Sequence, residues 1–285
     1  MVLVGTRDLA PLLEHAPTMA NFDAEPWAIE RVEILQALFE IDDRDRESLV
    51  PKALHPTIPP AAIFSVARYP DSPVGPFLLA QVKVSCRAAA LPRGFLLRAY
   101  ASTAAAADAL GKNWGYSCMV GDVRLARYHD RIVGSVRSLA NDAEILKVSL
   151  VDPEPISGAD VQYVSTMNLA KIVDSGAAAL TGARAPSPAL TSTADLTGAW
   201  PVAPAPAGPS PAVALVQVDA DCTFHKAERG RPQIDVFDAP SWLAAGITPV
   251  YPMNATCTII DAGFPAIRFI LDPNQPAITG TTKLR

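Results

Sequence analysis

Short runs of apolar residues, many of them alternating with polar ones and bounded by Pro, Gly, Asp or Ser, recur along most of this 285-residue chain. Runs of this length that are rich in β-branched and aromatic residues predict strands. After a strand-like stretch that begins at Trp27, we predict strands at residues 62–68, 78–86, 94–100, 123–128, 131–136, 145–151, 212–223, 232–237, 248–260 and 266–271. Many short strands with few helices indicate an α+β fold that is predominantly antiparallel β, with helices at one end of a barrel or sandwich.

One helix is predicted with both of its ends. Ser102 and Thr103 can cap the N-terminus of an alanine-rich run at residues 104–110, and Gly111 can end it. This helix should lead the chain into a loop at residues 114–119. Two shorter helices are predicted at residues 44–50 and within residues 157–174.

The distribution of proline and small residues predicts the domain organisation. Residues 1–26 mix apolar residues with three prolines, and we expect them to form an arm that packs on the body of the protein or on a second subunit of a homo-oligomer. Residues 176–211 are dominated by Ala, Pro, Ser, Thr and Gly, which is typical of a long surface loop. Residues 27–285 are therefore expected to form a single domain with this loop as an insertion.

Charge and composition narrow the class of partner. The formal net charge is −5 and no run of lysine and arginine occurs, which argues against binding to nucleic acid or to an anionic membrane surface. No apolar run approaches the roughly 20 residues of a membrane span, so a cytoplasmic location is expected. The four cysteines lie far apart and show no metal-ligand spacing, so no metal is expected. A small organic molecule is the partner that fits best.

The segment at residues 111–121 reads Gly-Lys-Asn-Trp-Gly-Tyr-Ser-Cys-Met-Val-Gly. It resembles the catalytic loop Gly-Arg-Glu-x-x-x-Tyr/Phe-Pro-Lys-Lys-x-Gly of the acetoacetate decarboxylase family. Other segments resemble this family in order and spacing, at residues 42–54, 71–77, 100–111, 132–136, 210–218, 225–227, 236–238 and 249–250. The resemblance covers most of residues 27–272. It implies an acetoacetate decarboxylase-like β-barrel or cone with a few peripheral helices.

The resemblance fails at the residues that carry the family's chemistry. In that family the first lysine of the loop forms a Schiff base with a β-keto acid, and the second lysine lowers its pKa. With Tyr116 aligned to the family's tyrosine, Cys118 and Met119 stand where the lysines should be, and a shift by one residue restores neither. Leu79 stands where the family has a glutamate, and Arg31 corresponds to its active-site arginine. The resemblance therefore implies a pocket without the catalytic amine.

The residues expected around this pocket fall into two groups. The candidates for a catalytic role are Tyr116, Arg31 and Gln81. The candidates for contact with the substrate are Leu79, Arg98, Tyr100, Trp114, Cys118, Met119 and Asn168. Most of these side chains are apolar or neutral, so the pocket suits a largely apolar, polyketide-like substrate better than acetoacetate.

We therefore expect a cofactor-independent cyclase of specialised metabolism, catalysing an intramolecular [4+2] cycloaddition or a related ring closure. Such reactions develop little charge, and an enzyme can accelerate them by folding the substrate into a near-attack conformer.

Three alternatives remain open at the level of the sequence. The first is a decarboxylase, dehydratase or aldol-type lyase that uses Tyr, Arg or Cys without a Schiff base, with His129 or His225 as the base for a reactive Cys118. The second is replacement of the lost amine by Lys112. The third is a binding protein that kept the cavity and lost the catalyst.

Overall fold

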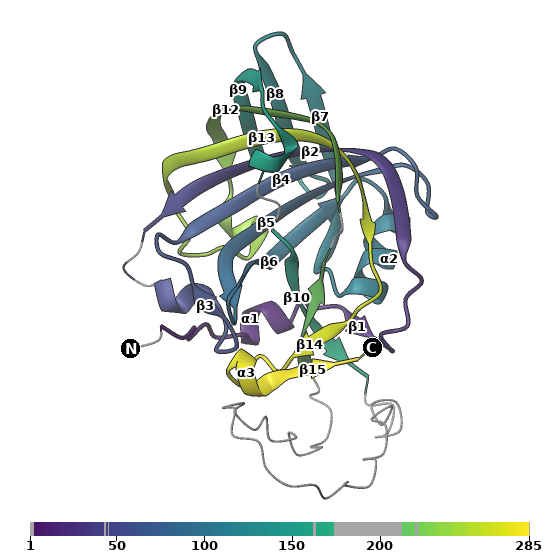
Figure 1. Ribbon diagram of the computed structural model, residues 1–285, viewed down its shortest axis with the longest axis vertical. Helices are drawn as coiled ribbons and strands as arrows, with labels where there is room; N and C mark the ends of the chain where they lie inside the picture. The colour runs from purple at the N-terminus through teal and green to yellow at the C-terminus, as the bar shows by residue number, and fades with distance from the viewer. Residues whose placement is uncertain are drawn as a thin grey trace, which may run out of the picture.

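The computed structural model describes residues 3–42, 44, 46–161, 164–173, 213–219 and 222–284. Within these residues, fifteen strands form one sheet with few helices (Figure 1). The strands are β1 Thr18–Met19, β2 Trp27–Ile41, β3 His55–Pro56, β4 Ala61–Tyr69, β5 Phe77–Ala88, β6 Leu91–Ala101, β7 Cys118–Arg127, β8 Arg131–Ser138, β9 Glu144–Pro155, β10 Thr166–Ile172, β11 Val213–Val218, β12 Thr223–Phe237, β13 Pro249–Phe264, β14 Phe269–Leu271 and β15 Thr281–Lys283. The helices are α1 Ala10–Leu13, α2 Ala104–Trp114 and α3 Ala277–Gly280, and the 3-10 turns are η1 Arg46–Leu49, η2 Gly158–Asp160 and η3 Ala239–Trp242.

Nine of the described strands close into a ring. Their order is β6-β7-β8-β9-β12-β13-β2-β4-β5, and the pairing of β5 with β6 completes the circuit. All neighbours in the ring are antiparallel except β6 and β7, which run parallel. The long pair β2 and β13 shifts register three times, and such irregularities bend and twist strands as a closed ring requires.

Strand β6 has two partners along one of its edges. Near its C-terminal end Ala99 pairs with Cys118 of β7, and near its N-terminal end Gly94 pairs with Thr166 of β10. Strand β10 then continues the sheet through β11 and β14 to β15, and we call these four strands the branch. In Figure 1 the labelled branch strands β10, β14 and β15 lie below the ring and α2 lies beside it.

The ring is filled by buried apolar side chains, which we call the ring core. Leu35, Phe64, Val82 and Val148 are members of this cluster. The walls of the ring touch through it, because a Cβ atom added to Gly134 of β8 would lie 2.6 Å from Val66 Cγ2 of β4. The inside of the ring is therefore packed.

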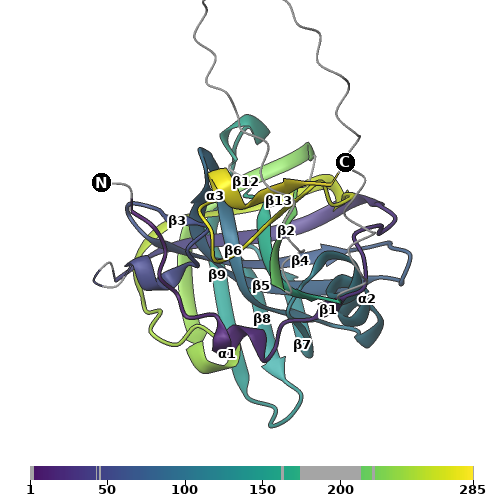
Figure 2. The same ribbon diagram turned by 90° about the horizontal axis from the view of Figure 1, so that it is seen from below.

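A second buried cluster, which we call the branch core, lies on the outer face of the same strands. Alternate residues of a strand point to opposite faces, so Ala67 of β4 and Leu79 of β5 belong to this cluster while Val66 and Ala80 face the ring core. Helix α2 and the branch cover it. Figure 2, seen from below, shows β6, β5, β4 and β2 in succession with α2 at one side.

The described part of the N-terminal arm crosses the ring and the branch. Gly5 donates its N–H to the Leu54 carbonyl at 3.0 Å, near η1. Further on, β1 pairs in parallel with the end of β10, Thr18 opposite Lys171.

The predicted fold class is confirmed, since strands dominate and helices are few. The short helices predicted at residues 44–50 and within residues 157–174 are the 3-10 turns η1 and η2. Other element predictions were wrong: helix α2 continues through Gly111 to Trp114, residues 166–172 form strand β10, and residues 223–237 form one continuous strand. The predicted loop at residues 176–211 lies outside the described residues. In the part of the chain that the structure describes, no helix has the length and apolar character to cross a membrane.

Candidate active site

A row of side chains crosses the outer face of the ring wall beneath the branch core. Each member is the direct cross-strand partner of the next, and direct partners point to the same face with Cβ atoms about 5 Å apart in antiparallel pairs. The row consists of Thr256 of β13, Gln36 of β2, Ser65 of β4, Gln81 of β5, Ala99 of β6 and Cys118 of β7, and we call it the polar row.

The centre of the polar row holds buried polar groups that the described residues leave unsatisfied. Gln81 is 4% exposed and Ser65 is 3% exposed. Neither Gln81 Oε1 nor Ser65 Oγ has a hydrogen-bond partner among the described residues. An unsatisfied buried polar group costs about 1–3 kcal/mol, so such groups often mark a place where function outweighs stability.

Helix α2 delivers the chain to one end of this row. Thr103 caps its N-terminus by accepting a hydrogen bond from the Ala106 N–H at 3.3 Å. At the other end Gly115 adopts a left-handed conformation with φ 72°, and its N–H donates to the Gly111 carbonyl at 3.1 Å. This C-terminal cap turns the chain sharply, so that Tyr116 is buried two residues after the helix ends.

Trp114 belongs to the wall beside the site, where it is held rigidly. Its side chain is fully buried, and its indole N–H donates to the Pro265 carbonyl at 2.8 Å. The ring also packs edge-on against Trp27, with centroids 4.9 Å apart, and in a tilted arrangement against Phe264, with centroids 5.1 Å apart.

The Tyr116 hydroxyl lies against β10. Burial raises the pKa of Tyr116 to about 12, although the neighbouring side chains of Thr166 and Asn168 act to lower it. Asn168 in turn donates from Nδ2 to the Trp114 carbonyl at 2.8 Å, which ties β10 to the end of α2. Tyr116 is therefore a protonated hydroxyl at neutral pH and a potential hydrogen-bond donor.

Cys118 and Leu79 also face the branch core. Burial raises the pKa of the Cys118 thiol to about 12, so the thiol is neutral at physiological pH. Leu79 is fully buried, and its cross-strand partner Ala101 follows Ala99 on the same face of β6. The structure thus brings Leu79, Gln81, Trp114, Tyr116, Cys118 and Asn168 to one side of the sheet.

Three of the expected substrate-contacting residues lie on the opposite side of the sheet. Arg98 Nη1 and the Tyr100 hydroxyl both donate to the Ser241 carbonyl, at 3.2 and 2.9 Å, and the Tyr100 ring packs on Trp242. Met119 is the cross-strand partner of Tyr100 and is 47% exposed. Neighbouring strand residues alternate between faces, so Met119 points away from Cys118, and that these three residues share one site with Cys118 stays a prediction.

Arg31 lies apart from both groups. It is exposed, sits in an irregularity between β2 and β13, and has φ 53°. Its N–H donates to Asp261 Oδ1 at 3.0 Å. The described contacts do not bring it to the polar row, and its place in the pocket stays a prediction.

The alternative catalytic groups lie at the surface. His129 lies in the exposed turn after β7, roughly 30 Å along the strand from Cys118. His225 pairs with Asp261 at 2.8 Å, and Lys112 pairs with Asp108 at 2.7 Å on the outer side of α2. No described contact places either histidine beside the Cys118 thiol.

One residue that the sequence did not single out stands on the same face as Gln81. Lys83 follows it by two positions on β5 and is 1% exposed. Burial lowers the pKa of Lys83 to about 8. A lysine within the apolar run at residues 78–86 was the available signal, but a strand lysine usually lies on a solvated face.

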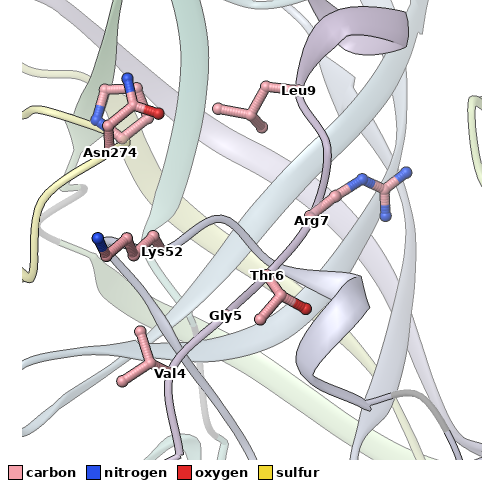
Figure 3. Close-up of a pocket in the computed structure, with 8 residues that line it drawn as sticks. Val4, Gly5, Thr6, Arg7, Leu9, Lys52 and Asn274 are labelled. Atoms are coloured by element: carbon pink, nitrogen blue, oxygen red, sulfur yellow. The ribbon is translucent and has the colours of Figure 1, made fainter.

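Other features of the surface do not add to this site. A separate pocket opens under the arm between Val4, Thr6, Leu9, Lys52 and Asn274, where Figure 3 shows the Arg7 guanidinium pointing away from Lys52 and Asn274. Among the described residues, no group of three or more His, Cys, Asp or Glu is arranged to hold a metal ion.

Comparison with known proteins shows which proteins this chain resembles. The family model described as acetoacetate decarboxylase matches residues 10–181. The crystal structure of acetoacetate decarboxylase from Legionella pneumophila is similar to the chain with a TM-score of 0.65 and 15% identity, over 86% of each chain. No curated protein sequence matches.

Two further solved structures are similar. The enduracididine biosynthesis enzyme MppR, complexed with the condensation product of pyruvate and imidazole 4-carboxaldehyde, has a TM-score of 0.60 and 14% identity, over 88% of this chain and 91% of that one. An acetoacetate decarboxylase-like enzyme from Sphingomonas wittichii RW1 has a TM-score of 0.56 and 14% identity, over 85% and 91%.

Proposed function

We propose a function from one premise: this chain belongs to the acetoacetate decarboxylase family. The solved structures that it resembles include acetoacetate decarboxylases and decarboxylase-like enzymes, so the chain is treated as an enzyme of this superfamily. We propose that it closes a ring in a neutral, mostly apolar substrate that carries a carbonyl group.

The observation that supports this proposal is the chemistry of the buried face that holds Cys118 and Leu79. The sequence resemblance assigns Cys118, a neutral thiol, to the position of the family's Schiff-base lysine, and Leu79, a buried hydrocarbon, to the position of a glutamate. A small carboxylate such as acetoacetate would lose its hydration beside the Cys118 thiol without gaining an ionic partner there. An apolar chain would gain by burial on the same face.

The remaining polar groups suit recognition of a neutral functional group. The Tyr116 hydroxyl stays protonated because burial raises its pKa to about 12, so it can donate a hydrogen bond to a carbonyl oxygen. Gln81 Oε1 and Ser65 Oγ are buried without a partner in the described residues and can bind a hydroxyl or N–H of the substrate. Held at these points, an extended chain would be folded into a near-attack conformer.

The test uses a linear trienone that has an enone at one end and a diene at the other. The purified protein is incubated with it, and the bicyclic ketone products are separated by chiral gas chromatography. We expect one stereoisomer in excess, and release of carbon dioxide from acetoacetate no faster than without protein. Products in the same ratio and configuration as in the protein-free reaction would contradict ring closure.

Two variants test whether Tyr116 and Cys118 take part in the reaction. Tyr116→Phe should slow product formation by about tenfold to a hundredfold because a hydrogen bond to the carbonyl is lost. Cys118→Ala should retain most of the activity, since a neutral thiol is not expected to attack the substrate. A loss beyond about a hundredfold in Cys118→Ala would instead indicate thiol catalysis.

A second candidate function is an aldol-type condensation or dehydration. It is favoured by the description of MppR with a condensation product of two carbonyl compounds, because that protein has a similar fold. Incubation of the protein with pyruvate and an aromatic aldehyde tests this function. A condensation product would then form from these two compounds, while the trienone of the first experiment would not be cyclised by the protein.

A further inference from the structure

A cavity at one end of the ring is separate from the polar row. It lies between the arm, the turn η1 and the segment that follows η3, and its volume is about 780 Å³. Sites for small molecules typically have volumes of about 300–1,000 Å³. The polar row lies on the outer face of the ring wall, whereas this cavity adjoins the ring core, to which its lining residues Leu12 and Leu49 belong. The cavity therefore has room for a ligand of its own.

The wall of the cavity holds a guanidinium that has no carboxylate partner among the described residues. Arg7 Nη1 and Nη2 donate to the carbonyls of Leu49 and Leu243, at 3.2 and 3.0 Å. Burial lowers the pKa of Arg7, and no described carboxylate acts to raise it. Figure 3 shows the guanidinium pointing away from Lys52 and Asn274 of the neighbouring pocket. Since a guanidinium has five N–H donors and two are used, Arg7 keeps donors and a positive charge for an anion.

A carboxylate lines the same cavity. Asp8 Oδ1 accepts a hydrogen bond from the Ala10 N–H at 3.0 Å, and Asp8 forms no ion pair with Arg7 or with another cation of the described chain. A second charged pair at the rim differs in this respect, because Arg44 Nε donates to Asp42 Oδ2 at 2.8 Å. Within the described residues, the cavity thus offers one positive and one negative charge that remain uncompensated.

Apolar side chains supply much of the remaining wall. They come from the arm, from η1 and from η3 with the residues after it: Pro11, Leu12, Leu49, Pro240 and Leu243. An apolar group of a ligand would be removed from water against this surface, which favours binding. The wall therefore combines two opposite charges with a hydrophobic surface.

We propose that this cavity binds a zwitterionic amino acid with a large apolar side chain. The carboxylate of the ligand lies against the Arg7 guanidinium, whose planar fork matches the geometry of a carboxylate, and the ammonium group lies against the Asp8 carboxylate. The side chain of the ligand packs on the leucines and prolines of the wall. This site goes beyond ring closure, because it shares no residue with the polar row.

The charge balance of the cavity favours a zwitterion over a simple anion. A carboxylic acid or a phosphate would gain from Arg7, but it would bring a second negative charge into the cavity that holds Asp8. Like charges brought together weaken binding, whereas a zwitterion gives each of the two residues a partner of opposite sign.

The proposal is tested by isothermal titration calorimetry of the full chain with L-leucine, L-phenylalanine and L-tryptophan. We expect at least one of them to bind, at one site per chain. For L-phenylalanine, 3-phenylpropionate lacks the ammonium group and 2-phenylethylamine lacks the carboxylate. Each analogue should bind at least about tenfold more weakly than the parent amino acid, because a charge-assisted hydrogen bond is lost. No binding of any of the three amino acids at about 10 mM, or an analogue that binds as tightly as its parent, would overturn the proposal.

Two variants test the assigned partners by comparing ligands within one protein. Asp8→Asn keeps an oxygen for the Ala10 N–H and removes the charge, so it should abolish the preference for the amino acid over the acid analogue. Arg7→Met should abolish the preference over the amine analogue. This comparison separates recognition from the stability that the carbonyl bonds of Arg7 provide. A preference that persists in either variant would overturn the assignment.

A third variant tests the location of the site without touching either charged residue. Ala245 is exposed and lines the cavity, so the indole of Ala245→Trp should fill the space and reduce binding at least about tenfold. Ala143→Trp is the matched control, because Ala143 is an exposed alanine in the turn between β8 and β9. The control should bind as the unaltered protein does. Equal binding by both tryptophan variants would refute this cavity as the site.

Discussion

Burial changes the chemistry of two residues on one face of the sheet in opposite directions. It raises the pKa of the Cys118 thiol to about 12 and lowers the pKa of the Lys83 amine to about 8. Both shifts favour the neutral form, because a low-dielectric surrounding disfavours charge. The Cys118 thiol is therefore neutral at pH 7, while the Lys83 amine still holds its proton in most molecules and loses it only near pH 8.

The pH dependence of stability provides a test of the buried lysine that needs no substrate. The pKa of Lys83 is about 8 in the folded protein and near 10.5 when unfolded, so between these values the unfolded chain holds more protons. The free energy of unfolding should therefore rise by about 3 kcal/mol from pH 8 to pH 10.5 through this residue. The check is denaturant unfolding of the unaltered protein and of Lys83→Met across this range, because the comparison cancels the other titrating groups. Parallel profiles would contradict the buried amine.

The placement of individual site residues could be predicted only in part. Leu79 and Gln81 share a face because they are two apart on a strand, a relation that a sequence shows directly. Cys118 and Met119 were both expected in the pocket wall, but β7 begins at Cys118 and its alternation sends Met119 to the other face. The burial of Lys83 could not be foreseen, because the branch that covers its face comes from distant parts of the chain.

At the scale of elements, helix α2 shows that a glycine in the sequence does not by itself mark the end of a helix. Gly111 looks like a C-cap in the sequence, but the helix continues because Gly115, four residues later, takes the left-handed conformation. Strand β10 was missed for a related reason. Its residues, Thr-Met-Asn-Leu-Ala-Lys-Ile, include several good helix formers, and they become a strand by pairing with β11 and, through short parallel contacts, with β6 and β1.

Alanine substitutions at two glycines with positive φ distinguish the cost of backbone strain from the cost of added side-chain contacts. A Cβ at Gly115 would lie 3.1 Å from Ala170 Cβ and 3.2 Å from Met19 Sδ, while a Cβ at Gly75 would meet nothing within 4 Å. Gly75→Ala should cost about 1–2 kcal/mol from the left-handed backbone alone, and Gly115→Ala about 2–4 kcal/mol because contacts are added. Equal losses in thermal or chemical unfolding would show that the end of α2 is not tightly packed against β10.

At the scale of the whole molecule, the closed ring and the forked strand account for the two cores. The family resemblance predicted a closed β architecture, but the branch and its pairing with β6 depend on contacts between segments that no local pattern connects. The arm adds a long-range tie. Arg7 donates to the Leu49 carbonyl at 3.2 Å and to the Leu243 carbonyl at 3.0 Å, and so joins η1 to the turn after η3.

Removing these two hydrogen bonds of Arg7 should destabilise the fold at one end of the ring. Burial lowers the pKa of Arg7 from its high ordinary value, yet a guanidinium remains charged, and its two bonds to carbonyls should stabilise the fold by about 1–3 kcal/mol. Arg7→Met should therefore lower the melting temperature by several degrees, as calorimetry would show. Arg137→Met, which removes a half-exposed arginine paired with Asp142, is the matched control and should change the melting temperature little. A similar melting temperature for both variants would contradict the bridging role.

The fork of β6 has a consequence for the kinetics of folding. Strand β6 forms its first edge with β5 through a connection of only a few residues, a contact of low sequence separation that can form early. Its other edge can pair only after β7 and β10 have reached it, and the residues of these strands that pair with β6 begin at Cys118 and Thr166. Until both arrive, a hydrophobic strand presents an open edge, the feature on which chains associate wrongly. An aggregation-prone stage of folding therefore precedes the completion of this one edge, and with it the assembly of the face that carries Lys83.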